Sequence, residues 1–444
     1  MSPTTSIRPR DRDTILSALR AGVVPRIGLQ HIQVGRQREI DALVKDIDRI
    51  GQGGAAMRFI IGEYGAGKTF FLFLVRQIAL QRKLVVAQAD LGPDRRIFAT
   101  GGRARGLYSE LTKSLATRTS PDGSALKSIL ETFAQKATEI AQAQKAQLEA
   151  TIYAALGDLR DMVSGHDFAT VVAAYARAYE ADDGEKQAAA LRWLRGEYST
   201  KTEARQDLGV RTIIDDGNVY DGLRLLARFS RVAGFGGLLV CLDEMVNLYK
   251  LQNSTARHQN YEQILRMLND ILQGTTEGLG VVFGGTPEFL YDTRRGLYSY
   301  EALQSRLAAN SFATAGLIDV SGPVIRLANL TQEELFHLLE RLRLVQAGGD
   351  PTRVALPDEA LAAFMEHCSK RVGEAYFRTP RNTVKAFLDL LAILEQNPQA
   401  DWRACLGAVE VAPDLVPHID AMSELDTNNP DNELVALDLS QPPR

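Results

Sequence analysis

Short apolar runs and longer amphipathic segments alternate along the chain, and this alternation predicts strands and helices in turn. The predicted strands, which are short and largely apolar, are residues 57–61, 84–91, 238–242, 280–283 and 323–327. Helical spacing of apolar positions marks residues 13–21, 37–50, 70–81, 220–232, 256–272 and 300–309. Because strands that alternate with helices form parallel sheets, the pattern predicts an α/β fold with helices on both faces of the sheet.

Two stretches depart from this alternation. Residues 120–208 are rich in Ala, Gln, Glu and Lys and keep a helical period, which predicts an all-helical insertion. After residue 329 helical spacing returns at 331–345, 357–369 and 380–396, which predicts a C-terminal helical lid. The expected division is an N-terminal helical segment (1–56), a core in two parts (57–119 and 209–328), the insertion (120–208), the lid (329–418) and a disordered acidic tail (419–444).

Composition restricts the class of protein. The 444 residues include 51 Lys and Arg against 55 Asp and Glu, a net charge of −4. This balance excludes a histone-like basic protein but allows a local basic patch. Three widely spaced cysteines form neither a disulfide framework nor a zinc site and fit a reducing compartment. With a polar start and no long apolar run, we expect a cytoplasmic protein without a membrane span.

Residues 62–69 (GEYGAGKT) fit the phosphate-loop pattern Gly-x-x-x-x-Gly-Lys-Thr, and they lie between a predicted strand and a predicted helix. Glycines let the backbone N–H groups turn toward phosphates, while Lys68 and the helix N-terminus add positive charge. The Thr69 hydroxyl is a ligand for Mg²⁺. We therefore expect ATP to be bound by Gly62, Glu63, Tyr64, Gly65, Ala66, Gly67, Lys68 and Thr69.

Polar residues follow two of the other predicted strands. Asp243 and Glu244 end the strand at 238–242, where Asp243 would hold Mg²⁺ through water and Glu244 would orient and deprotonate the attacking water. Thr286 follows the strand at 280–283 and would lie beside the γ-phosphate. A helix-capping Asp with a surface Glu, and a plain Gly-Gly-Thr-Pro turn, are the structural alternatives. The predicted activity is ATP hydrolysis with Mg²⁺.

The order of phosphate loop, acidic strand, polar strand end and helical lid resembles the AAA+ ATPase superfamily. Residues 34–40 (VGRQREI) resemble the element that precedes the loop in several AAA+ branches, which implies that Gly35 and Arg36 belong to the nucleotide site. Residues 379–381 (TPR) look like the second sensor of these proteins, which implies a catalytic role for Arg381.

Residues 304–307 (QSRL) are similar to the segment that carries the arginine finger in clamp-loader-like members. The resemblance implies that Arg306 completes the site of a neighbouring subunit in a homo-oligomer, with Arg294 and Arg295 as the next candidates. The competing interpretation is a helix-surface arginine paired with Glu301.

The chain resembles more closely the ATP-binding proteins of bacteriophage-exclusion (BREX) defence systems, of the BrxD type, which is related to the P-loop region of BrxC. The strings that carry this resemblance are residues 19–25, 34–36, 62–69, 242–244, 247–250, 260–262, 285–289 and 294–303. The resemblance implies a cytoplasmic component of an antiviral system that acts on or beside DNA with a helicase or methyltransferase. A nucleotide-gated scaffold with negligible turnover, and an AAA+ transposition regulator or loader outside phage defence, remain alternatives.

The densest group of arginines is Arg95, Arg96, Arg103 and Arg105, in a predicted loop after the second strand. Contact with the DNA phosphate backbone is the functional interpretation. A solvated loop is the other.

Overall fold

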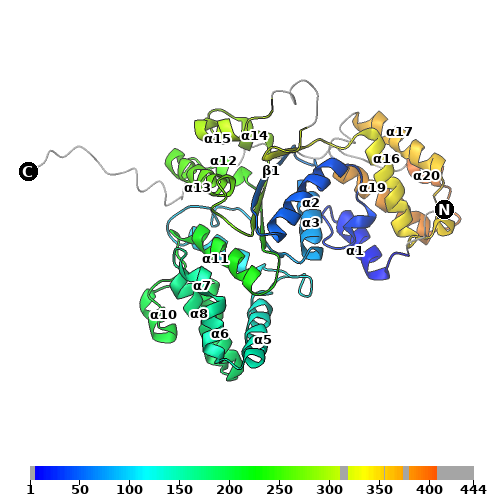
Figure 1. Ribbon diagram of the computed structural model, residues 1–444. Helices are drawn as coiled ribbons and strands as arrows, with labels where there is room; N and C mark the ends of the chain where they lie inside the picture. The colour runs from blue at the N-terminus through cyan, green and yellow to red at the C-terminus, as the bar shows by residue number, and fades with distance from the viewer. Residues whose placement is uncertain (1–5, 311–318, 355, 374–379, 408–444) are drawn as a thin grey trace, which may run out of the picture. The chain divides into compact units, whose positions relative to one another are not determined.

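The computed structural model describes residues 6–310, 319–354, 356–373 and 380–407. It confirms the α/β class, with a five-stranded parallel sheet in the order β2-β3-β4-β1-β5 (Figure 1). The strands are β1 (Ala56–Gly62), β2 (Val85–Asp90), β3 (Leu238–Asp243), β4 (Leu279–Gly285) and β5 (Val324–Leu327). In the register of β2 and β3, Val85 lies opposite Leu238 and Asp90 opposite Asp243.

The strands form where the sequence places continuous apolar runs, because both of their faces are buried. Every residue of β1, β3 and β4 is buried. The ring of Phe59 on β1 stacks on that of Phe283 on β4, with centroids 5.0 Å apart. Helices alternate with these strands: α2 (Gln37–Gly51), α3 (Lys68–Gln81), α11 (Val219–Val232), α13 (Ser254–Leu272) and α15 (Glu301–Leu307).

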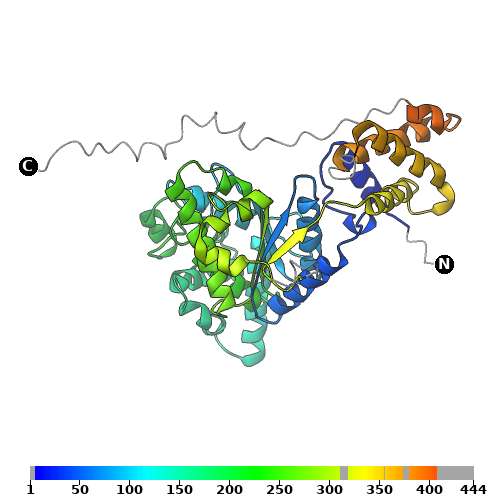
Figure 2. The ribbon, with the colours of Figure 1, turned by 90° about the horizontal axis from the view of Figure 1, so that it is seen from above.

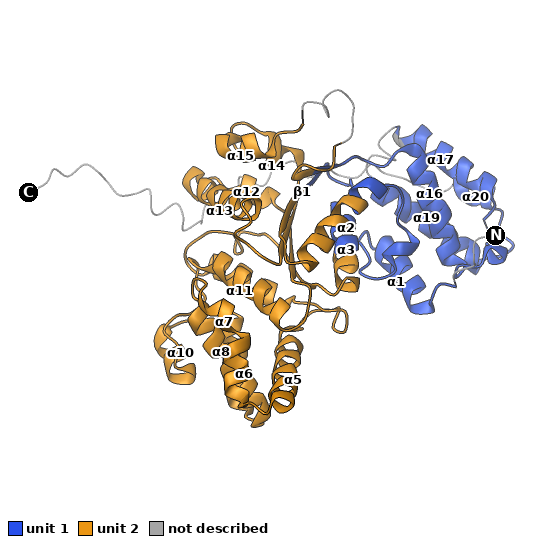
Figure 3. Ribbon diagram, viewed as in Figure 1, with its two compact units in different colours: residues 1–40, 60–75, 325–417 blue, residues 41–59, 76–324, 418–444 orange. Residues whose placement is uncertain are grey.

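The chain divides into two compact units, coloured separately in Figure 3. Unit 1 spans Met1–Ile40, Ile60–Val75 and Ile325–Pro417; unit 2 spans Asp41–Phe59, Arg76–Val324 and His418–Arg444. Unit 1 thus contains the phosphate-loop sequence together with residues 1–40 of the predicted N-terminal segment and most of the predicted lid. The residues with uncertain placement, which include the acidic tail 419–444 and Thr379, lie outside the described part of the chain.

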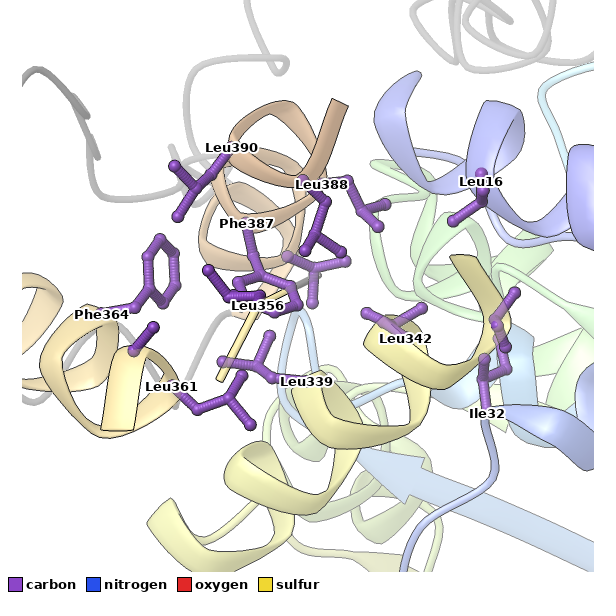
Figure 4. Close-up of a cluster of buried hydrophobic side chains, with 14 of the residues drawn as sticks. Leu16, Ile32, Leu339, Leu342, Leu356, Leu361, Phe364, Phe387, Leu388 and Leu390 are labelled. Carbon is purple, nitrogen blue, oxygen red and sulfur yellow. The ribbon is translucent and has the colours of Figure 1, made fainter. Parts of the chain in front are cut away.

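In unit 1 the N-terminal helix α1 (Pro9–Arg20) shares one core with the lid helices α16 (Gln332–Gln346), α17 (Asp358–Val372) and α19 (Pro380–Gln396) (Figure 4). Leu16 of α1 is buried in this core with Leu339 of α16 and Phe387 of α19. The guanidinium of Arg12 also donates to the backbone carbonyl of Gln346 at 2.8 Å. The segments at opposite ends of the sequence therefore form a single helical cluster. A short helix, α20 (Trp402–Gly407), follows α19.

In unit 2 the stretch from 120 to 208 is helical, as its composition indicates. It contains α5 (Leu126–Gln144), α6 (Leu148–Ala155), α7 (Gly157–Arg160), α8 (Gly165–Glu180), α9 (Gly184–Leu194) and α10 (Lys201–Leu208). Figures 1 and 2 show these helices gathered in one group. Its aromatic centre is Phe168, whose ring meets those of Trp193 and Phe229 edge-on with centroids 6.2 Å and 5.9 Å away.

One predicted loop is a helix. Residues 103 to 113 form α4 (Arg103–Lys113), which buries Ala104, Leu107, Tyr108 and Leu111 on one face. The two glycines before it, Gly101 and Gly102, suggested a loop, and the helix begins directly after them because its apolar residues recur at helical spacing. Among the described residues, no helix combines the length and apolar content that crossing a membrane requires.

Candidate nucleotide site

The phosphate-loop sequence adopts a tight turn between strand β1 and helix α3. Gly65 and Gly67 have φ angles of +81° and +78°, a region that residues with a Cβ rarely adopt. At Gly62 a Cβ would meet the carbonyl oxygen of Leu327 at 3.0 Å. The first turn of α3 begins at Lys68, so the N-terminus of the helix directly follows the loop. The sequence pattern is thus folded as a tight turn that leads into the N-terminus of a helix.

Lys68 closes this turn. Its ammonium donates hydrogen bonds to the carbonyls of Gly62 and Glu63, both at 2.8 Å. The side chain therefore spans the loop from its last residues back to its first and places a full positive charge at its centre. Hydrogen bonds from a charged donor are about twice as strong as neutral ones, so they hold the loop in its curled form.

Arg36, just before helix α2, lies against the same loop. Its guanidinium donates to the carbonyl of Ala66, and to the carbonyl of Ala328 at 3.2 Å. Burial lowers the pKa of this guanidinium, and the carboxylates of Glu334 and Glu39 oppose that shift. The predicted neighbourhood of Arg36 and the phosphate loop is therefore present within unit 1.

Arg381 and Tyr64 connect the lid to the loop. The guanidinium of Arg381, at the start of α19, donates to the Tyr64 hydroxyl at 3.2 Å and lies 5.6 Å from the centre of its ring. Arg381 is exposed, and its Cδ would lie 3.4 Å from a Cβ at Gly22. The lid arginine predicted from the sequence thus contacts a residue of the phosphate loop itself.

In unit 2 the acidic strand β3 ends in a strained turn. Asp243 is buried, at 5% exposure, and its side chain accepts a hydrogen bond from the backbone N–H of Glu244 at 2.9 Å. Glu244 is exposed and has a φ of +59°, which is uncommon for a residue other than glycine. Burial raises the pKa of the neighbouring Cys241 thiol to about 12, so it stays protonated. The turn therefore separates one buried carboxylate from one exposed carboxylate.

Thr286 follows β4, the strand that pairs with β3. Its hydroxyl oxygen is buried and has no hydrogen-bond partner among the described residues. It precedes the short helix α14 (Pro287–Tyr291), but its side chain does not cap that helix. An unsatisfied buried hydroxyl costs about 1–3 kcal/mol, so a polar group supplied by a ligand is the natural partner. This observation argues against a plain structural turn.

Comparison with known families identifies the family of this chain. The family model described as BREX system ATP-binding protein BrxC/D matches residues 7–410. The chain belongs to this family. The match confirms the resemblance found in the sequence and identifies a BREX-system protein that binds ATP. A search of curated proteins found no match.

In this BrxC/D chain the predicted finger residue Arg306 is exposed near the end of α15. Its side chain donates to Asn269 of α13 at 2.8 Å and to the carbonyl of Ala302 at 2.8 Å. These partners differ from the Glu301 carboxylate of the competing interpretation. Both of these partners are neutral groups.

The other two finger candidates behave differently from each other. Arg295 donates to the carbonyls of Tyr249 and Leu251, at 3.2 Å and 3.3 Å, and its guanidinium lies 5.4 Å from the Tyr249 ring centre. Arg294 is exposed. Asp292 accepts hydrogen bonds from the backbone N–H groups of both arginines, which together with the Tyr249 hydroxyl lower the pKa of its carboxyl. Arg295 thus serves to join the segments that follow β3 and β4.

The arginine cluster after β2 is not one continuous loop in this BrxC/D protein. Arg95 and Arg96 lie in the loop, but Arg103 opens helix α4 and Arg105 lies on it. Arg96 is only 4% exposed, and Arg105 donates to a backbone carbonyl of the helical insertion at 3.1 Å. Arg95 lies 3.8 Å from the carboxylate of Glu110. The four arginines therefore have different surroundings and do not form one solvated cluster.

The sequence did not single out Glu334 as part of the site. It is the third residue of helix α16, where its carboxylate and the Thr331 side chain form a reciprocal capping box. The same carboxylate lies against Gly35, where a Cβ would collide with it. The Thr-x-x-Glu pattern signals the helix start, but its contact with the residues before α2 depends on tertiary packing.

Proposed function

We propose that this BrxC/D protein hydrolyses ATP and that residues 62–69 bind the phosphates. The observation that carries the proposal is the curled loop, with its two left-handed glycines and the inward ammonium of Lys68. A loop of this shape at a helix N-terminus offers N–H donors and positive charge to an anion. The printed family description, an ATP-binding protein, supports ATP as that anion.

The remaining roles follow from the ends of the strands. In a parallel sheet ligands bind at the edge formed by the carboxyl ends of the strands. The loop follows β1, the acids follow β3, and Thr286 follows β4, which the strand order places between the other two. We therefore assign γ-phosphate contact to Thr286, and activation of the attacking water to the exposed carboxylate of Glu244.

Thr69 and Asp243 are the residues that would hold Mg²⁺. A hydroxyl and a carboxylate are oxygen donors of the kind that this ion prefers. When bound with ATP, Mg²⁺ neutralises charge that develops on the phosphate oxygens. The buried hydroxyl of Thr286, which has no hydrogen-bond partner among the described residues, and the ammonium of Lys68 are each of the kind that a phosphate-bearing ligand uses.

We further propose a cytoplasmic role in phage defence, in which ATP turnover drives assembly on DNA or with a helicase or methyltransferase of the BREX system. The family description supports the defence context. The guanidinium of Arg306 is exposed and bonded to neutral groups, which supports a homo-oligomer in which one subunit completes the active site of the next. Arg381 contacts the loop from the lid and would respond to the state of the bound phosphates.

The experiment that tests hydrolysis compares the wild type with Glu244→Gln. The variant keeps the size and hydrogen-bonding capacity of the side chain but lacks a base, so ATP binding should persist while turnover falls by about 10²–10⁴. Turnover is measured with and without DNA. If the wild type binds ATP but shows no turnover in either condition, the protein is a nucleotide-gated scaffold and the proposed ATPase activity is wrong.

A further inference from the structure

Arg36 contacts the phosphate loop at one defined peptide group. Its guanidinium donates to the carbonyl of Ala66, and its Nη1 lies 3.5 Å from where a Cβ of Gly67 would be. The guanidinium therefore lies on the outer side of the Ala66–Gly67 peptide. This contact rests on the loop backbone, so it is present whatever part of a nucleotide the loop holds.

The planarity of the peptide bond turns this contact into a constraint on the next N–H. In a trans peptide the C=O and the N–H point in opposite directions. If the carbonyl of Ala66 is held toward Arg36, the N–H of Gly67 must point away from Arg36. Because Gly67 has a φ of +78°, where glycine moves freely, this peptide would flip more readily than its neighbours without the anchor.

Arg36 is itself held from the lid. It also reaches the carbonyl of Ala328, between β5 and α16, and the carboxylate of Glu334 attracts its charge. The Glu334 carboxylate is fixed because it accepts a hydrogen bond from the backbone N–H of Thr331 at 2.9 Å. Gly35 leaves room for that carboxylate, since any side chain there would collide with it. The anchor of the loop is therefore built on the first turn of a lid helix.

We propose that Arg36 is a positioning residue, which orients the N–H of Gly67 toward the phosphates and does not itself bind the nucleotide. This inference rests on the proposed phosphate site. It differs from the expectation that Arg36 contacts ATP directly. It also makes the shape of the loop depend on α16, so that a displacement of the lid would weaken the hold on the phosphates.

The test measures the affinities of ATP, ADP and AMP, by competition against a fluorescent ADP analogue. Arg36→Ala should lower the affinities for ATP and ADP by about ten- to hundredfold and leave the affinity for AMP unchanged. AMP lacks the phosphates that the Gly67 N–H would contact. Arg36→Lys should recover part of the loss, since an ammonium keeps the positive charge and a donor for the Ala66 carbonyl but lacks the fixed planar geometry of the guanidinium. The control is Arg38→Ala, an exposed arginine two residues further on, in helix α2, which should change none of the three affinities.

The outcomes separate this inference from the proposed function. If Lys68→Ala leaves ATP affinity unchanged, the phosphate loop does not bind ATP and the proposed function is wrong. If Lys68→Ala weakens ATP but Arg36→Ala does not, only the positioning role is wrong. An equal loss of AMP and ATP in Arg36→Ala, in a protein with an unchanged unfolding temperature, would mean that Arg36 binds the nucleoside. If Arg36→Ala does not fold, the ratio of the ATP affinity to the AMP affinity is measured in Arg36→Lys instead.

Discussion

Glu244 is held in a backbone conformation that favours glycine, so replacing it with glycine should stabilise the fold while removing activity. Its φ of +59° lies in the left-handed region, directly after the last residue of β3. Backbone strain of this kind persists at functional sites because a particular side chain is needed there. We therefore compare Glu244→Gly, which relieves the strain, with Glu244→Gln, which keeps it.

The expected magnitude is small but measurable. A left-handed residue with a Cβ costs about 1–2 kcal/mol, and glycine gives back about 0.5–1 kcal/mol through its greater freedom in the unfolded chain. Glu244→Gly should therefore exceed Glu244→Gln in free energy of unfolding by roughly 0.5–1 kcal/mol. If the free energy of unfolding falls by about 2 kcal/mol per molar urea, the urea concentration at the unfolding midpoint should be about 0.2–0.5 M higher in Glu244→Gly than in Glu244→Gln.

The assay is urea unfolding of the nucleotide-free proteins, followed by a turnover measurement on each. Both Glu244 variants should lose turnover, because neither carries the base. A matched control is Lys145→Gly, at the exposed C-terminal end of α5, where the φ is +52°. It should gain similar stability and keep wild-type turnover.

Two results would refute this reasoning. If Lys145→Gly is stabilised but Glu244→Gly is no more stable than Glu244→Gln, the turn at Glu244 is not strained. If Glu244→Gln keeps wild-type turnover, the side chain is not the base, and the strain has another purpose.

Three further predictions concern the other site residues. Thr286→Val should raise stability or leave it unchanged, because it removes an unsatisfied hydroxyl, yet lower turnover at saturating ATP; normal turnover would exclude a γ-phosphate contact. Arg306→Ala should bind ATP but hydrolyse it poorly, and mixing it with Glu244→Gln should restore partial activity; turnover per subunit that does not change with dilution to a monomer would exclude a shared site. Replacing Arg95 and Arg103 with Ala should lower the salt dependence of DNA binding by about two units of slope, and an unchanged slope would leave the cluster as solvated surface.

Local patterns in the sequence predicted the elements of the fold well. The strand at 238–242 is β3 (Leu238–Asp243), and the helix at 380–396 is α19 (Pro380–Gln396). These elements follow from apolar runs and from apolar positions at helical spacing, which depend on the segment alone. Helix α4 was missed because paired glycines and arginines outweighed its apolar spacing.

Contacts between distant segments could not be predicted in the same way. The apolar face of α1 indicated burial, but nothing in its sequence identified α16 and α19 as its partners. The contact of Arg36 with the Ala66 carbonyl depends on a backbone group, which has no signature in the sequence. The left-handed turn at Glu244 is similar, because a carboxylate at that position gives no indication of its φ.

The most direct test of the proposed nucleotide site is a calorimetric titration of the wild-type protein and Lys68→Ala with ATP and Mg²⁺. The lysine ammonium is held against the start of the loop by the carbonyls of Gly62 and Glu63, so its loss removes the positive charge of the loop sequence itself. We expect saturable binding of ATP to the wild type and a loss of affinity of at least about tenfold in the variant. Equal affinities in the two proteins would contradict the proposed phosphate-binding role of residues 62–69.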